Sequence, residues 1–488
     1  MTTEKRISTV VALALALLTG SAYPAAAHDD LASASPGGGD TLAAVPDTLR
    51  LTFTRQQDLD LASVRLFGPA GEVALGDLLQ HPDSSAVVLV PVVGRWSAGD
   101  HTVRWRIVGQ DGHPVAGEYT FVVREEARGL PAEELSDSLG ASGAPPGPPG
   151  QDAGPADGAQ PAPFDVQSPA YVAVRWLGFG ALLGVLGAVS WALLVLPLAR
   201  RWDGGVAVAE GWGRAATVGA WSAGLLLLAT FGRLWAQGRA LGSGDPDGPS
   251  LIGSVLTSTV WGAGWWLQLV ASLLALAAFL WARRGRKSLP WALAGVAALG
   301  LSFTPALSGH AVAVDGVASL AVLADGAHVL AAGGWMGGLL LLLVAGVPPA
   351  LGEDGTRERL APLVEAFSLT ALGFATILVV TGVFASWLHL GRLADLWTTP
   401  YGRTLLVKLG LLLPLLATGA YNWLRVRPAL SRGEGGARRL RRSGGAELAV
   451  AVAVLLATAV LVATPPPAET PRPAVAGAQM SNPQEKQP

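Results

Sequence analysis

The segment "HTVRWRIVGQDGHPVAGEYTFVV" (residues 101–123) alternates apolar and polar residues on both sides of a short turn. Its first run places Val103, Trp105 and Ile107 on one face of an extended chain, which is the pattern of a half-buried strand. The same period of two recurs in "LRLTF" (49–53), "SVRLF" (63–67) and "EYTFVV" (118–123), with Gly, Pro and Asp clusters between the runs. The pattern predicts a β-sandwich or barrel of roughly 100 residues, large enough to bury its own core.

The turn inside this segment carries two side chains that could bind a metal ion. Asp111 and His113 flank a glycine just before a strand, so both side chains can face the same way. Asp-Gly-His alone is also a common turn, in which Asp caps the backbone and His is solvated. A metal site therefore needs further ligands from elsewhere in the domain.

The N-terminus offers such ligands. Lys5 and Arg6 precede an apolar run from Val10 to Leu18 and three alanines at 25–27, a pattern typical of a secretory signal peptide over residues 1–27. Cleavage after Ala27 would make His28 the first residue, so its α-amine and Nδ1 could close a chelate ring. Cu(II) suits such a site best, because it has the highest divalent affinity and favours nitrogen and oxygen ligands.

Composition limits the function classes. The chain has 488 residues, of which 51% are hydrophobic and 14% charged, and it has no cysteine. Such an apolar chain belongs mostly in a bilayer, and its basic residues lie in short loops, which excludes a nucleic-acid-binding face. Without cysteine there are no disulfides and no thiolate ligands, so any metal is held mainly by nitrogen and oxygen.

After the β domain, residues 126–168 are rich in Pro, Gly and Ala without periodicity, which indicates a semi-extended linker. An all-α membrane domain is predicted over 169–464, with an external tail at 465–488. Apolar segments of membrane-spanning length lie near 170–198, 215–237, 259–282, 288–308, 320–346, 365–389, 404–424 and 446–463.

The loops between these spans predict the orientation. Those after spans one, three, five and seven carry 3, 4, 2 and 7 Lys or Arg, and those after spans two, four and six carry 1, 0 and 2. By the positive-inside rule the odd-numbered loops are cytoplasmic. The β domain and the C-terminus are then extracytoplasmic on a bacterial cell (inner) membrane, as a cleaved signal also requires.

Residues 28–124 resemble a CopC-type copper-binding domain. The likeness rests on the start at His28, on "SASPGGGDTLAAVPDTLRLTF" (33–53) and on the "DGHPVAG" turn (111–117) before an aromatic strand. It implies an Ig-like Greek-key fold and a Cu(II) site formed by His28, Asp111 and His113. Asp29 stands where the family usually has a small residue, and the Met-rich segment that gives some members a Cu(I) site is absent. His81 and His101 match no ligand pattern and are interpreted as surface histidines.

Residues 168–467 resemble the CopD family of membrane copper proteins. The likeness rests on "YGRTLLVKLGLLLPLLATGAYNWLRVRP" (401–428), "DGAHVLAAGGWMGGLL" (325–340) and "TPPP" (464–467). The order of the two halves is that of CopC-CopD fusions, including those of the YcnJ type. The resemblance implies copper homeostasis or resistance through copper passage across the membrane, in the inward direction. The glycines of 333–338 are interpreted as sites of close helix approach, and Arg175 and Lys408 as interfacial or polar partners.

The remaining histidines predict a second metal site at the outer side of the membrane. His310 follows span four, Asp325 and His328 are three residues apart near the start of span five, and His389 ends span six. Ionisable groups are costly in lipid and are biased toward function, so these four residues are expected to receive copper from the β domain. Met336 is a possible deeper contact on the same helix face. In the alternative, His310 and His389 are interfacial and Asp325 only pairs with His328.

Three other functions stay open from the sequence. An N-terminal His with a second His also forms the copper brace of oxidative polysaccharide-cleaving enzymes, although Asp111 would occupy a position that such an enzyme keeps open. His328 and His389 could instead ligate haem in an electron-transfer protein. A membrane-anchored copper sensor would not require eight spans. A transporter is favoured over an enzyme, with copper ions and the bilayer as partners and with copper donor and acceptor proteins unidentified.

Overall fold

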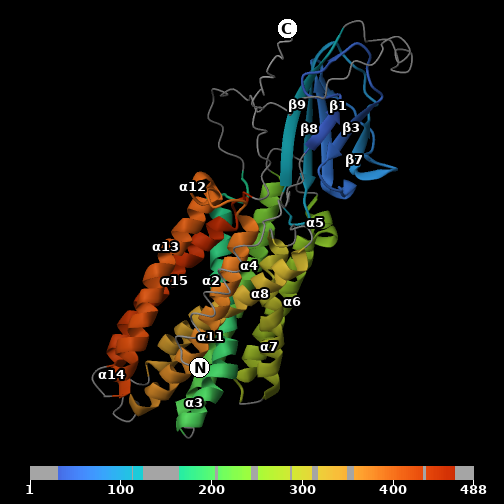
Figure 1. The fold of residues 1–488 in the computed structure, drawn as a ribbon. Helices are drawn as coiled ribbons and strands as arrows, with labels where there is room; N and C mark the ends of the chain where they lie inside the picture. Colours follow the sequence, from blue (N-terminus) through green and yellow to red (C-terminus); the bar gives the residue numbers. More distant parts are fainter. Residues whose placement is uncertain are drawn as a thin grey trace, which may run out of the picture.

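The structure is a computed structural model that describes residues 31–112, 114–124, 164–203, 207–242, 251–285, 288–309, 311, 317–348, 357–431 and 436–467. A β-sandwich stands at one end of a bundle of long helices (Figure 1). We call this end of the bundle the outer end and the opposite end the inner end. The predicted signal peptide with His28, most of the linker, and the tail beyond 467 lie outside the described residues.

The β domain is formed by two packed sheets. The first sheet has the order β1-β3-β7-β6 and the second the order β2-β9-β8-β4-β5. The strands are β1 (Leu31–Ser35), β2 (Thr41–Leu42), β3 (Thr48–Phe53), β4 (Ala62–Gly68), β5 (Gly71–Val73), β6 (Leu79–His81), β7 (Ser84–Pro91), β8 (Gly99–Val108) and β9 (Pro114–Val123). All four strands predicted from the sequence are confirmed, together with the sandwich itself.

The core of the sandwich follows the predicted alternation. Val103, Trp105 and Ile107 of β8 are buried against residues of β3 and β7. Trp105 lies opposite Gly117 on β9, and a Cβ on Gly117 would stand 2.6 Å from the indole ring. Glycine is needed at 117 because the ring lies over that backbone position.

The interpretation of His101 as a surface histidine is wrong. Its side chain is fully buried, stacked on Phe121 at 5.7 Å and tilted against Trp96 at 5.1 Å between ring centroids. His101 shares the parity of Val103 and Trp105 on β8, so the strand alternation turns it inward. His81 ends β6 in a turn, where its Nδ1 accepts the Asp83 N–H at 3.2 Å.

Eight helices in the described residues are long and apolar enough to cross a membrane, which confirms the predicted spans. They are Pro169–Arg201, Gly211–Leu241, Val260–Ala282, Ser288–Ser308, Ala318–Gly346, Leu360–His389, Pro400–Leu430 and Gly436–Leu461. Their main α-helical parts are α2 (Pro169–Ser190) with α3 (Leu196–Asp203), α4 (Ala207–Leu241), α6 (Val260–Ala282), α7 (Ser288–Phe303), α8 (Ala318–Ala332) with α9 (Gly338–Leu341), α11 (Arg357–His389), α13 (Pro400–Tyr421) with α14 (Arg427–Ser431), and α15 (Gly436–Leu461). Short helices α5 (Ile252–Ser258) and α12 (Asp395–Thr398) lie at the outer end (Figure 1).

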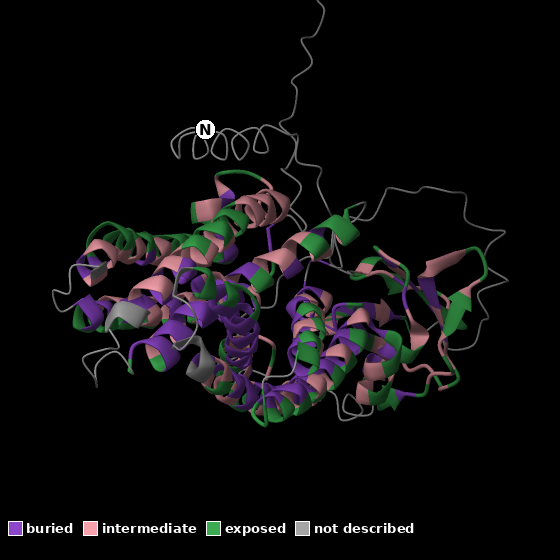
Figure 2. Cartoon of the chain, turned by 90° about the horizontal axis from the view of Figure 1, so that it is seen from below, coloured by how far each residue is buried: buried purple, intermediate pink, exposed green. Residues whose placement is uncertain are grey.

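Helix α2 is the centre of the bundle. Of the eight spans it has the largest buried share, and Figure 2 shows the buried residues gathered around the middle of the bundle while the outer faces are exposed. Gly187 of α2 meets Gly337 of the fifth span so closely that a Cβ on Gly187 would stand 2.3 Å from the Gly337 backbone. The predicted close helix approach at the glycines of 333–338 is therefore confirmed.

Three of the spans contain π-helical turns. These turns are η4 (Trp191–Val195) in the first span, η8 (Gly333–Gly337) and η9 (Leu342–Gly346) in the fifth, and η10 (Asn422–Val426) in the seventh. A π-turn shifts the angular position of every residue that follows it and often marks a functional site. The helix-face relation predicted between His328 and Met336 assumed a regular α-helix, whereas Met336 lies within the π-turn η8.

Candidate metal centre

The Asp111 turn is well defined between β8 and β9. The Gly112 N–H donates to the Gly109 carbonyl at 2.9 Å, and Asp111 is 8% exposed. His28 and His113, the other two predicted ligands, lie outside the described residues. Of the predicted Cu(II) ligands, the structure describes Asp111 alone.

This turn is docked on the membrane domain. The Gln237 side-chain amide on α4 donates to the Gly112 carbonyl, and the Trp261 main-chain N–H at the start of α6 donates to the Gln110 carbonyl at 3.1 Å. Gly112 has a φ of +77°, and a Cβ there would stand 2.7 Å from the Trp261 side chain. Glycine is required at 112 for both reasons, and the two carbonyls beside Asp111 are both held by the bundle.

Apolar packing extends this contact. Leu61 and Val108 of the sandwich form a buried cluster with residues of α4, α5 and α6. Arg106 donates to the Leu241 carbonyl at the end of α4. Figure 1 shows the lower ends of β8 and β9 reaching this corner of the bundle, above α5. Burial of leucine, valine and tryptophan side chains stabilises the docked position.

Beneath the docked turn lies a polar group with two cations. Tyr171 of α2 donates to the Gln237 side chain at 2.7 Å, and Arg233 of α4 donates to Gln268 at 2.6 Å. The Arg175 guanidinium lies 4.8 Å from the Tyr171 ring centroid, and that of Arg233 5.5 Å from the Trp261 ring. Two positive charges here oppose a cation moving straight down between α2, α4 and α6. Arg175 therefore faces protein partners, where the sequence allowed an interfacial role.

A second group of ionisable residues lies deeper, on α8, α11 and α13. His328 Nδ1 is 2.8 Å from the Thr381 hydroxyl, and Lys408 interacts electrostatically with both Asp325 and His328. At a rise of 1.5 Å per residue, Asp325 lies about 10 Å and His328 about 15 Å below the start of α8 at Ala318. Lys408 lies about 12 Å below Pro400, at a comparable depth. The polar partner that the sequence allowed for Lys408 is Asp325.

His328 and His389 stand at two levels. Thr381, the partner of His328, and His389 are both on α11, eight residues and therefore about 12 Å apart along the helix. His389 lies at the outer end, with its ring 6.3 Å from the Tyr401 ring. His310 lies outside the described residues. Among the described residues, no three His, Cys, Asp or Glu side chains form a metal-binding cluster.

The difference in depth between His328 and His389 argues against the hypothesis that these two histidines ligate one haem. Two axial histidines must face each other at one depth, whereas Thr381 occupies the position across from His328. Met336 is partly buried against the main hydrophobic core. The two histidines of α8 and α11 therefore do not form one shared cofactor site among the described residues.

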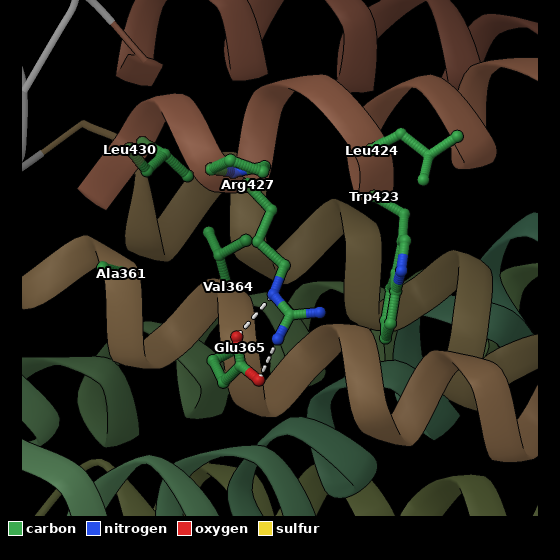
Figure 3. Close-up of a pocket in the computed structure, with 8 residues that line it drawn as sticks. Ala361, Val364, Glu365, Trp423, Leu424, Arg427 and Leu430 are labelled. Carbon is green, nitrogen blue, oxygen red and sulfur yellow. Dashed lines mark hydrogen bonds and ion pairs between the residues drawn. The ribbon is translucent and has the colours of Figure 1, made fainter. Parts of the chain in front are cut away.

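A cavity of about 490 Å³ lies at the inner end, far from these groups. Figure 3 shows it between α11 and α14, with Glu365 and Arg427 paired across it. The Arg427 guanidinium also lies 4.4 Å from the Trp423 ring centroid. This ion pair joins α11 to α14, and we assign it a structural role.

Sequence reasoning missed Gln237, Trp261 and Gln268. Gln237 and Gln268 are almost fully buried in apolar spans, and a polar amide inside a span is a sign of an internal partner. Their partners could not be read from the sequence, because Gly112 is 125 residues from Gln237.

Three family models match the chain. "CopC domain" matches residues 31–124, "Copper resistance protein D-like, N-terminal domain" residues 165–320, and "Copper resistance protein D" residues 361–461. "Copper transport protein CutJ" of Bacillus subtilis (strain 168) is 25% identical over 436 residues, which are 88% of this chain and 73% of that protein. "Copper resistance protein C" of Escherichia coli is 30% identical over 121 residues, which are 22% of this chain and 90% of that protein.

Two solved CopC-type structures are similar to about a fifth of this chain. CopC from Methylosinus trichosporium OB3b is 26% identical and covers 22% of this chain and 96% of its own, with a TM-score of 0.19. PcoC, a methionine-rich copper resistance protein from Escherichia coli, is 26% identical and covers 20% of this chain and 100% of its own, also with a TM-score of 0.19.

Proposed function

This chain belongs to the copper resistance and transport family whose members carry CopC and CopD domains, and we propose that it takes up copper. In this proposal the β-sandwich captures Cu(II) outside the cell, and the helical bundle passes copper inward across the membrane. The proposal includes no enzymatic reaction, in keeping with relatives named for copper transport and copper resistance.

The docking of the Asp111 turn carries this proposal. Asp111 lies between Gln110 and Gly112, whose carbonyls accept hydrogen bonds from α6 and α4. Copper held by Asp111 would already stand at the outer surface of the bundle. Transfer from the sandwich to the membrane domain would then require ligand exchange over a short path, without a domain swinging on its linker.

The proposed capture site consists of the His28 amine and imidazole with Asp111 and His113. Residues 28–124 contain no Cys and no Met, which are the soft ligands that Cu(I) selects. We therefore propose that this site prefers Cu(II). A competition titration against Cu(II) and Cu(I) chelators checks it, and tighter binding of Cu(I) would refute the preference.

The proposed second step uses His310, His389, Asp325 and His328. The arginine pair below the docked turn opposes a cation, whereas Asp325 with the His328 imidazole offers a carboxylate and a nitrogen ligand. His310 and His389 would receive copper at the outer level, and Asp325 and His328 would bind it about 12 Å deeper. The proposal therefore has two copper-binding positions passed one after the other, and not the single site of all four residues that the sequence suggested.

The proposed location is the bacterial cell (inner) membrane, with the sandwich outside. Helices α3 and α14, which carry basic residues at the ends of spans one and seven, lie at the inner end (Figure 1). The positive-inside rule then makes the inner end cytoplasmic.

Copper uptake into lipid vesicles tests the proposal. Vesicles containing the whole chain, with the sandwich facing outward, should accumulate radioactive copper supplied outside. The His113→Ala variant should lose capture, and the double variant Asp325→Ala, His328→Ala should bind Cu(II) normally without accumulating copper. His81→Ala is the matched control, because His81 lies in a surface turn of the same domain. Normal accumulation by the double variant would contradict the proposed path.

A further inference from the structure

Glu447 is a buried carboxylate on α15 that the proposed copper path does not use. Its side chain is 3% exposed. The Asn422 amide donates to Glu447 Oε2 at 2.8 Å, and the Trp335 side chain also interacts with the carboxyl group. The Ser443 hydroxyl donates to Asn422 Oδ1 at 2.5 Å, which orients the amide N–H toward Glu447. Residues of the fifth, seventh and eighth spans thus converge on one acidic group.

The partners of Glu447 are all neutral. In the part of the chain that the structure describes, no ion pair involves Glu447. The charged residues on the elements packed against α15, and on α15 itself, are Arg175, Arg403, Lys408, Arg425, Arg427, Arg438, Arg439, Arg441 and Arg442. An ionised carboxylate without a counter-charge is very costly in a low-dielectric interior, whereas a neutral carboxylic acid is not. The surroundings therefore suit a carboxyl group that holds a proton.

The backbone around Glu447 is irregular in two places. Asn422 begins the π-turn η10, and Trp335 is the middle residue of the π-turn η8. Such turns interrupt the regular helix and frequently occur at functional sites. Asn422 and Trp335 therefore both lie in π-helical turns and not in regular α-helix.

The position of Glu447 is below the His328 level. Trp335 is 17 residues beyond Ala318, about 26 Å from the outer end of α8, compared with about 15 Å for His328. Glu447 is 11 residues from Gly436, about 16 Å from the inner end of α15. A Cβ on Gly419 would lie 3.9 Å from Glu447 Oε1, so Gly419 of α13 stands beside this second oxygen.

We propose that Glu447 is a proton-binding site in the inner half of the membrane domain, neutral at rest, which releases its proton when copper passes. The second part of this inference rests on the proposed function, and the first part does not. Release breaks the carboxyl O–H bond, passes the proton to water, and leaves a carboxylate that the Asn422 and Trp335 N–H groups stabilise. The negative charge then favours the cation in the bundle, and reprotonation restores the resting state.

Infrared spectroscopy of the whole chain in lipid tests the resting state without copper. The spectrum at neutral pH should contain a carbonyl band of a protonated carboxyl group that is absent from Glu447→Gln. In Glu447→Asp the band should return at a shifted frequency, which shows that the site still folds around an acid. Glu365→Gln, which removes a carboxylate paired with Arg427, should keep the Glu447 band. A spectrum unchanged by Glu447→Gln would overturn the proposal.

Vesicle uptake under an imposed pH difference tests the coupling to copper. Wild-type uptake should change several-fold with the direction of the pH difference, and Glu447→Gln should lose this dependence while binding Cu(II) normally outside. Glu72→Gln, at an exposed pair on the sandwich, should behave as wild type. If the wild type accumulates no copper but keeps the infrared band, the proposed function fails while the proton site stands. Uptake by Glu447→Gln with unchanged pH dependence would refute the coupling.

Discussion

The Gln237 side chain on α4 donates a hydrogen bond to the Gly112 carbonyl in the turn that contains Asp111. The same side chain accepts a hydrogen bond from Tyr171 on α2 at 2.7 Å. One buried amide therefore links the proposed Cu(II) turn to two spans of the membrane domain. The position of the sandwich on the bundle is thus tied to the residues closest to the proposed ligands.

Replacing Gln237 by leucine should loosen this docking. The variant keeps the side-chain bulk but removes the bonds to Gly112 and Tyr171, at an expected cost of about 1 to 3 kcal/mol for the buried polar groups left unpaired. Hydrogen exchange at the backbone amides of residues 109–112 should accelerate in the whole protein. Gln167→Leu, at an exposed position before α2, is the control, and equal exchange in the two variants would contradict the docking role.

An N-terminus extended by one residue before His28 should lose Cu(II) affinity. The extension moves the α-amine away from the imidazole chelate ring, and loss of one good ligand should weaken binding at least tenfold, about 1.4 kcal/mol. Titration of the native and extended proteins with a Cu(II) chelator measures the difference. Identical affinities would eliminate the amine as a ligand.

Asp325 and Lys408 should behave as a coupled pair. Lys408→Met removes the cation that interacts with the Asp325 carboxylate, and Asp325→Asn removes the negative charge that interacts with Lys408, so each single change should destabilise the bundle. The double variant should be less destabilised than the sum of the two, with a coupling of about 1 kcal/mol or more. Thermal unfolding in lipid or detergent measures the cycle, and strictly additive effects would exclude the pairing.

Tyr119 should make the sandwich sensitive to alkali. Burial raises the pKa of Tyr119 well above its usual range, and the charge of Asp40 acts in the same direction. The folded state then binds this proton more tightly than the unfolded state, so stability present below about pH 10 should fall as the pH rises further.

The Tyr119→Phe variant tests the role of the buried hydroxyl group. Among the described residues the buried Tyr119 hydroxyl has no hydrogen-bond partner, so Tyr119→Phe should stabilise the domain by about 1 kcal/mol. Tyr119→Phe should also reduce the loss of folding stability at alkaline pH. Urea unfolding of residues 28–124 at neutral and alkaline pH measures both effects, and a destabilised Phe variant would contradict the first.

Much of the fold could be predicted because strand alternation and span length are local properties of the sequence. The run at 101–108 predicted β8, and extending its alternation by one residue would also have placed His101 inside. Strand β7 was missed, since "SSAVVLVP" (84–91) is a continuous apolar run that has no period of two. The eight spans followed directly from their apolar length.

The site was less predictable because its contacts join distant segments. Histidines and acids at the outer ends of spans could be placed by depth alone, which located Asp325 and His328. The pairing of His328 with Thr381, the interaction of Asp325 with Lys408 and the docking of Gly112 on Gln237 depend on which helices are neighbours. Met336 also lies within the π-turn η8, so its helix face relative to His328 could not be predicted from regular α-helical geometry.

The central claim, inward copper transport, is tested most directly by cellular copper content. Cells with and without this protein are grown at limiting external copper, and their copper is measured per cell. The account predicts a higher copper content in cells that contain the protein, with the difference lost in the Asp325→Ala, His328→Ala double variant. A lower copper content in cells that contain the wild-type protein would show export and contradict the account.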